Sequence, residues 1–136
     1  ARITQVNTLK RKQFVKGMQE LAQEGAIQIF REPGFGMESV IVGVVGVLQL
    51  EVLEQRLKSE YNVEVRRTPL SYTDIRWIEN DPKEIDIPGL NLTRDTLRAE
   101  DMRGRKLLLF TSPWNVNWAA EHNPDLKLSE VGNFDL

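Results

Sequence analysis

Gly43-Val-Val-Gly-Val-Leu-Gln-Leu-Glu-Val52 runs into Arg56-Leu-Lys-Ser-Glu-Tyr-Asn-Val-Glu-Val65, and this stretch decides the fold. Leu50, Leu53 and Leu57 recur at the spacing of an amphipathic helix, which places them on one face. The apolar run before this helix and the alternating residues after it each predict a strand. The stretch therefore predicts a strand, a glycine junction, a helix that packs on a sheet, and a second strand.

The residues that precede this stretch predict another helix and the strands that complete a sheet. Asn7 is a suitable N-cap, because its side chain can accept a hydrogen bond from a free amide of the first turn. Apolar residues at helical spacing predict a helix over Leu9–Glu24, and Gly25 suits the left-handed position that follows a helix. The order β-α-β-β-α-β is that of the ferredoxin-like split βαβ unit. Strands are predicted over Arg2–Val6, Ala26–Phe30, Ser39–Val45 and Val63–Arg67.

Glycines and charged residues predict three further details of this half. Pro33-Gly-Phe-Gly36 is expected to make a hairpin connection. Glu54 and Lys58 are four residues apart and are expected to pair on the wet side of their helix. Gly43 and Gly46 are expected to let the helix pack closely on its strand, because no P-loop pattern accompanies them.

The second half of the chain is predicted to be built mainly from strands. Ile75 and Trp77 are expected to share one face of its first strand, and Gly104 to form the turn of a hairpin. The polar residues Asn80–Asn91 predict a loop with at most a short helix. The strands are predicted over Ser71–Glu79, Thr96–Met102, Arg105–Thr111 and Leu126–Val131.

A third helix is predicted near the end of the chain. Ser112 suits its N-cap, Pro113 its first position, and Pro124 its end. The fold class is therefore α+β. Residues 1–68 are expected to form a ferredoxin-like half, and residues 69–136 a second, related α+β half that packs with it as one domain.

Composition narrows the classes of function. The chain has 136 residues, a net charge of −2 and no cysteine. The absence of cysteine excludes disulfides, thiolate zinc sites, iron–sulfur clusters and thiol nucleophiles, and it fits a reducing compartment. The longest apolar runs are too short to cross a bilayer, so no membrane partner is expected. We expect a cytoplasmic protein.

No motif predicts a catalytic, cofactor or metal site. The pattern of a nucleotide-binding P-loop is absent, and so are the common hydrolase and metalloprotease motifs. His122 is the only histidine and is expected at the surface near a helix C-terminus. Carboxylates that cluster around Pro82 are expected to form a solvated acidic loop. They are Glu79, Asp81, Glu84 and Asp86.

Basic residues give the strongest functional signal. Several of them crowd the start of the first helix, where cations oppose the helix dipole, so local stability does not explain them. Contact with RNA phosphates would explain them, and scattered solubilising charge is the alternative. The candidate contact residues are Lys10, Arg11, Lys12, Lys16, Arg66, Arg67, Arg103, Arg105 and Lys106.

Three tryptophans could serve as platforms on which bases stack. They are Trp77, Trp114 and Trp118. Each lies on a predicted apolar face, so we expect them to be core residues instead.

The blocks quoted first also carry a resemblance to a known family. Gly43–Val65 resembles the third domain of translational GTPases such as elongation factor G. The closer resemblance is to the C-terminal domain of bacterial class II peptide-chain release factors, and it covers nearly the whole chain. The hairpin Glu32–Ser39 and the loop Asn80–Arg94 depart from that pattern. The blocks that match in order are Glu24–Phe30, Gly46–Gln49, Arg56–Glu64, Arg76–Glu79, and Thr111-Ser112 with Asn123–Leu126.

The resemblance implies a parent protein with an N-terminal GTP-binding domain and a β-barrel second domain. GTP and Mg²⁺ would bind in those parts, so no catalytic or nucleotide-binding residue is carried onto this chain, and this fragment is not expected to be an enzyme. Such factors use GTP to dissociate the codon-reading release factors after peptide release. The C-terminal domain is implied to contact the ribosome, mainly small-subunit RNA and a protein near the decoding region, and the other domains of its own chain.

Two alternatives remain. Within the superfamily, the chain could be the C-terminal domain of another translational GTPase, such as a paralogue of elongation factor G. Outside it, the chain could be a stand-alone ferredoxin-like domain that hydrolyses an acyl phosphate or binds a small ligand. The loop Val6–Leu9 lacks the glycine-rich phosphate cradle that acyl phosphate hydrolysis would need.

Overall fold

The computed structural model describes residues 1–25, 27–33, 39–44, 46–81 and 83–130, except for the side chains of Thr8 and Val47. The chain divides into two compact units, Ala1–Leu70 and Ser71–Leu136. Each unit is α+β, and together their described residues form three α helices and eight strands.

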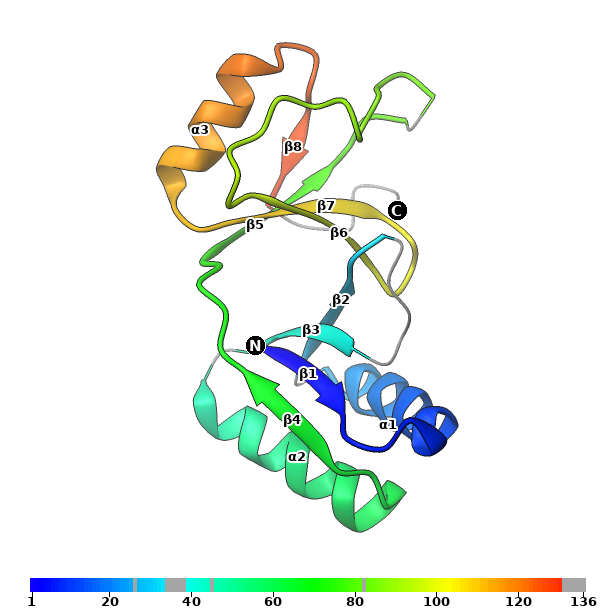
Figure 1. The fold of residues 1–136 in the computed structure, drawn as a ribbon. Helices are drawn as coiled ribbons and strands as arrows, with labels where there is room; N and C mark the ends of the chain where they lie inside the picture. Colours follow the sequence, from blue (N-terminus) through cyan, green and yellow to red (C-terminus); the bar gives the residue numbers. More distant parts are fainter. Residues whose placement is uncertain (26, 34–38, 45, 82, 131–136) are drawn as a thin grey trace. The chain divides into compact units, whose positions relative to one another are not determined.

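The first unit is a four-stranded antiparallel sheet with two helices on one side (Figure 1). Its strands lie in the order β4-β1-β3-β2. The predicted strands are therefore present, with ends that differ from the prediction by at most two residues. The elements are β1 (Arg2–Gln5), the short 3-10 helix η1 (Thr8–Lys10), α1 (Arg11–Gln23), β2 (Gln28–Arg31), β3 (Ser39–Gly43), α2 (Val47–Tyr61) and β4 (Val65–Thr68).

Predicted caps define the ends of the helices. The Asn7 side chain accepts a hydrogen bond from the amide of Leu9 at 3.0 Å. This turn is a 3-10 helix, so α1 itself begins at Arg11 and later than predicted. Gly25 has a φ of +83° and Asn62 a φ of 56°, which is the left-handed conformation that ends helices.

The core of the first unit lies between the sheet and the two helices. Leu50, Leu53 and Leu57 of α2 are all buried there, as their spacing predicts. They meet Phe14 and Met18 of α1, both fully buried. Burying each side chain of this size stabilises the unit by about 1.5–3 kcal/mol relative to leaving it in water. This contact fixes both helices on the same face.

Gly17 lies where α1 packs tightly against α2. A Cβ atom at Gly17 would lie 2.8 Å from a methyl group of Leu57 and 3.0 Å from the ring of Tyr61. The prediction that Gly46 permits close packing is wrong, since nothing lies within 4 Å of a Cβ there. Gly46 is instead the N-cap of α2, and its amide donates to the Gln49 side chain at 3.4 Å.

The second unit is also antiparallel, with strands in the order β6-β7-β5-β8. Leu108 and Phe110 of β7 pack with Ala119 of α3, and the loop residues Leu90 and Leu92 join this core. The elements are β5 (Asp74–Ile78), β6 (Leu97–Asp101), β7 (Lys106–Phe110), α3 (Pro113–His122) and β8 (Leu128–Ser129).

The second unit follows its predicted order of elements except at its end. Its one helix within the described residues, α3, is the helix predicted near the end of the chain. Its last strand, β8, contains only two residues and is shorter than the predicted Leu126–Val131. The Ser112 cap, Pro113 and the Gly104 turn are confirmed, with φ of +80° at Gly104.

The tryptophan prediction is confirmed only in part. Trp77 is buried, and the strand register places it beside Leu107 and Ile75 beside Leu109. Trp114 is 66% exposed, so its assignment to the core is wrong. Asn115 and Ala119 occupy the buried face of α3, which turns Trp114 toward solvent.

The predicted hairpin connection Pro33-Gly-Phe-Gly36 lies, apart from Pro33, outside the described residues. Among the described helices, none is long and apolar enough to cross a membrane.

Candidate functional site

Among the nine candidate contact residues, the ion pairs of Arg67, Arg105 and Lys106 are seen directly. Arg67 of β4 lies 3.1 Å from the carboxylate of Glu54 on α2, so the predicted Glu54–Lys58 pair is wrong. The register explains this, because Arg67 sits opposite Ile3 on the face of the sheet that the helices cover. In the second unit, Arg105 pairs with Asp101 and Lys106 with Glu100. The positive charge of these three residues is largely compensated.

Asp101 organises the hairpin that carries Arg103 and Arg105. Its carboxylate accepts hydrogen bonds from the amides of Arg103 and Arg105 and from Nε of Arg105 at 2.8–3.0 Å. The indole of Trp77 donates to the same carboxylate at 3.1 Å. Burial raises the pKa of Asp101, but these donors outweigh burial and lower the pKa below its ordinary value. This group shapes the turn, and of the cations Arg103, Arg105 and Lys106 on this hairpin Arg103 alone makes no ion pair with a described residue.

The cations at the start of α1 form the most open basic group. Lys12, Lys16 and Arg11 are exposed, and Lys10 is partly exposed. Lys10, Lys12 and Lys16 make no ion pair with any residue that the structure describes. No acidic residue lies in the first turn of α1. Arg66 is likewise exposed, but it lies on β4 opposite Thr4.

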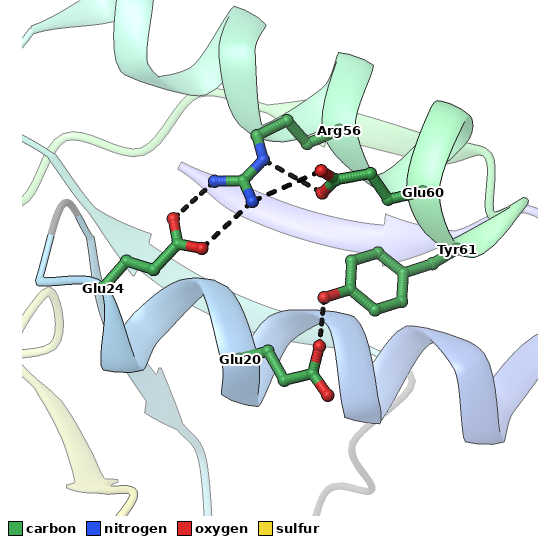
Figure 2. A network of polar contacts seen from close by, with 5 residues as sticks. All are labelled: Glu20, Glu24, Arg56, Glu60 and Tyr61. Carbon is green, nitrogen blue, oxygen red and sulfur yellow. Dashed lines mark hydrogen bonds and ion pairs between the residues drawn. The ribbon is translucent and has the colours of Figure 1, made fainter.

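Two acidic residues near the C-terminal end of α1, Glu20 and the C-cap residue Glu24, contact α2. Figure 2 shows Glu24 facing Arg56 and Glu20 facing Tyr61. Nη2 of Arg56 lies 3.0 Å from Glu24, Nη1 of Arg56 bonds the second oxygen of Glu24, and Nε of Arg56 lies 3.0 Å from Glu60. The bond from Arg56 lowers the pKa of Glu24, and the bond to Glu20 raises the pKa of Tyr61 to about 12.

This network is a feature that the sequence prediction missed. Arg56 and Glu60 are four residues apart on α2, a spacing that favours an ion pair. The contact of Arg56 with Glu24 and the contact of Tyr61 with Glu20 depend on how α1 and α2 pack. Helical periodicity does not specify that packing. The network engages Glu20 and Glu24 with side chains of α2, while Lys12 and Lys16 make no ion pair with any described residue.

The other candidate groups are His122 and the acidic loop after β5. The described residues contain no group of three or more His, Asp or Glu side chains that could hold a metal ion. His122 is exposed, as predicted, and its ring stacks on Trp118 with centroids 3.7 Å apart. Acidic residues of the loop after β5 are exposed, as predicted; these are Glu79, Asp81, Glu84 and Asp86.

Comparison with known proteins decides the family. A family model described as the C-terminal domain of class II release factor RF3 matches residues 1–120. The chain belongs to the RF3 family. Within the translational GTPases, this match favours RF3 over a paralogue of elongation factor G.

Individual relatives agree with the family match. Peptide chain release factor 3 of Gloeothece citriformis is 42% identical over 125 residues, which is 92% of this chain and 23% of that protein. The corresponding proteins of Lactobacillus acidophilus and Listeria welshimeri are 40% and 37% identical over 129 and 130 residues. The chain spans about a quarter of the length of these curated relatives. The matching family model describes the C-terminal domain of RF3 and not its GTPase domain.

Proposed function

We propose that this chain is the ribosome-docking C-terminal domain of a GTP-dependent translation termination factor. The observation that carries the proposal is the match of residues 1–120 to the C-terminal domain of RF3. In this account the parent protein promotes dissociation of the codon-reading release factors after peptide release. We expect the parent protein to act in the cytoplasm, where ribosomes and release factors are found.

The chemistry of the parent protein belongs outside this domain. GTP and Mg²⁺ would bind in the part of the relatives that this chain does not span. The domain contributes binding energy and position, with the small ribosomal subunit as its main partner and the other domains of its own chain as its neighbours. Its open cations at the start of α1 support an electrostatic contact with ribosomal RNA.

We also infer that the first unit is the ferredoxin-like split βαβ unit found as domain III of translational GTPases. The support is its element order and its strand order, β4-β1-β3-β2, with every neighbouring pair antiparallel. The second unit completes the domain. The boundary between the two units falls at Leu70.

A domain exchange tests the proposed function. The segment of Gloeothece citriformis release factor 3 that aligns with this chain is deleted, or replaced by this chain. Dissociation of a codon-reading release factor from terminated ribosomes is then followed in the presence of GTP. We expect the deletion to abolish dissociation and the chimaera to restore it. An unrelated ferredoxin-like domain of similar size serves as the control graft, and a chimaera no better than this control would contradict the proposal.

A further inference from the structure

We propose that three lysines at the start of α1 bind backbone phosphates of ribosomal RNA. We call them the lysine stripe and define it as Lys10, the last residue of η1, with Lys12 and Lys16 of α1. This inference rests on the proposed ribosome docking and names the surface and the chemistry of the contact. It goes beyond the nine basic residues that the sequence alone selects, because it separates the available charges from the compensated ones.

Helix geometry places Lys12 and Lys16 on one side of α1, and Lys10 ends the 3-10 helix η1 just before it. Lys12 and Lys16 are four residues apart, so their side chains lie one above the other. Phe14, Met18 and Leu21 occupy the buried side of the same helix. Leu9, just before the stripe, is 88% exposed. The stripe is therefore a solvent-facing surface whose cations can reach a partner without any change in the core.

In the network between α1 and α2, the carboxylates nearest the stripe bond to side chains of α2 and not to the lysines. Lys16 and Glu20 have the spacing of a helical ion pair, yet Glu20 accepts the hydroxyl of Tyr61 instead. Glu24 is likewise bound by Arg56 (Figure 2). The two carboxylates of α1 are thus occupied on the side that meets α2. Within the described residues, the three lysines of the stripe have no acidic partner.

Stability of the helix does not account for this arrangement. The positive end of the helix dipole lies where Lys10 and Lys12 stand, and acidic residues are favoured there. Lys12 and Lys16 also repel each other at their four-residue spacing. The chain as a whole is slightly acidic, with a net charge of −2, so the stripe is a local concentration of positive charge. An anionic partner would offset both unfavourable effects.

The residue types favour a phosphate backbone over a sequence-specific contact. The stripe contains lysines, which act as point charges on phosphate, and lacks the paired arginine geometry that reads a guanine edge. Phosphate contacts position a protein on RNA without reading its sequence. The ion-paired cations Arg67, Arg105 and Lys106 are expected to contribute much less, because a phosphate would have to displace an existing carboxylate.

Charge reversal on the stripe tests this inference. Lys12→Glu/Lys16→Glu is prepared in the 136-residue chain. Its matched control is Lys83→Glu/Lys127→Glu, which changes the net charge equally at two exposed lysines of the second unit. Binding to a fluorescein-labelled RNA hairpin is measured by anisotropy over a range of salt, and binding to small ribosomal subunits by sedimentation. Thermal unfolding of each variant reports folding.

We expect the stripe variant to lose at least ten-fold in RNA affinity while remaining folded, with a melting temperature equal to or above that of the unmodified chain. The slope of log K against log salt is expected to fall by about one for each lysine changed. The control variant is expected to bind like the unmodified chain. Equal RNA affinity and salt slope in the stripe and control variants would overturn the inference.

Sedimentation with small subunits, compared with RNA binding, separates this inference from the proposed function. If the chain binds subunits equally well with and without the stripe charges, docking stands and the stripe is not its contact. If the stripe variant loses subunit binding but the unmodified chain ignores the RNA hairpin and protein-free ribosomal RNA, the partner is an acidic protein and the phosphate assignment is wrong. If RNA binding depends on the stripe but the chain does not bind subunits, the inference holds and the proposed function fails.

Discussion

Arg56 of α2 binds Glu24 of α1 through two guanidinium nitrogens, with Nη2 of Arg56 3.0 Å from Oε1 of Glu24. The same guanidinium reaches Glu60 one turn further along α2. The bond from Arg56 lowers the pKa of Glu24, so the Glu24 carboxylate is charged throughout the physiological range. It ties the C-terminal end of α1 to α2, while Lys12 and Lys16 of α1 have no acidic partner among the described residues.

The bond between Tyr61 and Glu20 makes one titration readily measurable. Hydrogen bonding to Glu20 raises the pKa of Tyr61 to about 12. Because this pKa lies above the ordinary value of about 10, the bond stabilises the fold fully below pH ~10 and ceases to do so as pH rises through about 12. In a Tyr72→Phe background, tyrosinate absorbance reports Tyr61 alone. Glu20→Gln is expected to move its pKa down toward 10, and Glu121→Gln on α3 is the control. A Tyr61 pKa near 10 in the background protein would refute the bond.

The close approach at Gly17 predicts an unusual response to alanine. A glycine in a helix interior normally gains about 1 kcal/mol of stability on replacement by alanine. At Gly17 the new methyl group would meet Leu57 and Tyr61, and overpacking of this kind costs about 1–3 kcal/mol. We therefore expect Gly17→Ala to lower the free energy of unfolding by about 1 kcal/mol, as measured by urea denaturation.

A second substitution shows whether the effect arises from that contact. Leu57→Val shortens the side chain that Gly17→Ala would strike. The two changes together are expected to cost less than the sum of their separate costs. A Gly17→Ala variant that is more stable than the unmodified chain would show that α1 and α2 do not approach as described.

Asp101 predicts both a stability change and its dependence on pH. In Asp101→Asn an NH₂ group would face donors, since Trp77 and Nε of Arg105 both donate to the carboxylate. We expect a loss of about 1–3 kcal/mol at neutral pH, measured by thermal or urea unfolding. The pKa of Asp101 is lowered in the folded chain, so its contribution is present above its ordinary pKa and is lost as pH falls through the folded value. The variant should therefore lack this part of the acid sensitivity.

The exposed Asp125 supplies a charge-matched control for Asp101. Asp125→Asn is expected to change stability by less than about 0.5 kcal/mol. If Asp101→Asn behaves like Asp125→Asn across the acid range, the carboxylate of Asp101 does not organise the turn.

Local sequence patterns predicted most of the elements of the fold. The spacing of Leu50, Leu53 and Leu57 defines the buried face of α2, and Asn7 and Ser112 mark helix starts, because these signals depend only on neighbouring residues. The errors arise where a partner is distant in sequence. Glu54 pairs with Arg67 rather than Lys58 because β4 returns beside α2.

The burial of tryptophans shows the same limit. Trp77 and Trp114 both lie on predicted apolar faces. Trp77 is in β5, which has β7 and β8 on either side. In α3 the buried positions are Asn115 and Ala119, so Trp114 is left exposed. For the candidate site, the sequence could locate the cations but not their partners. Which lysines are uncompensated depends on the packing of α1 against α2, and that became visible only in three dimensions.

Competition for small ribosomal subunits tests the account most directly. The labelled 136-residue chain is sedimented with purified small subunits at low salt, with and without unlabelled full-length release factor 3 from Listeria welshimeri. We predict that the chain sediments with the subunits, that rising salt releases it, and that the full-length factor displaces it. A chain that stays in the supernatant at low salt, or that remains bound when the full-length factor is in excess, would contradict the account.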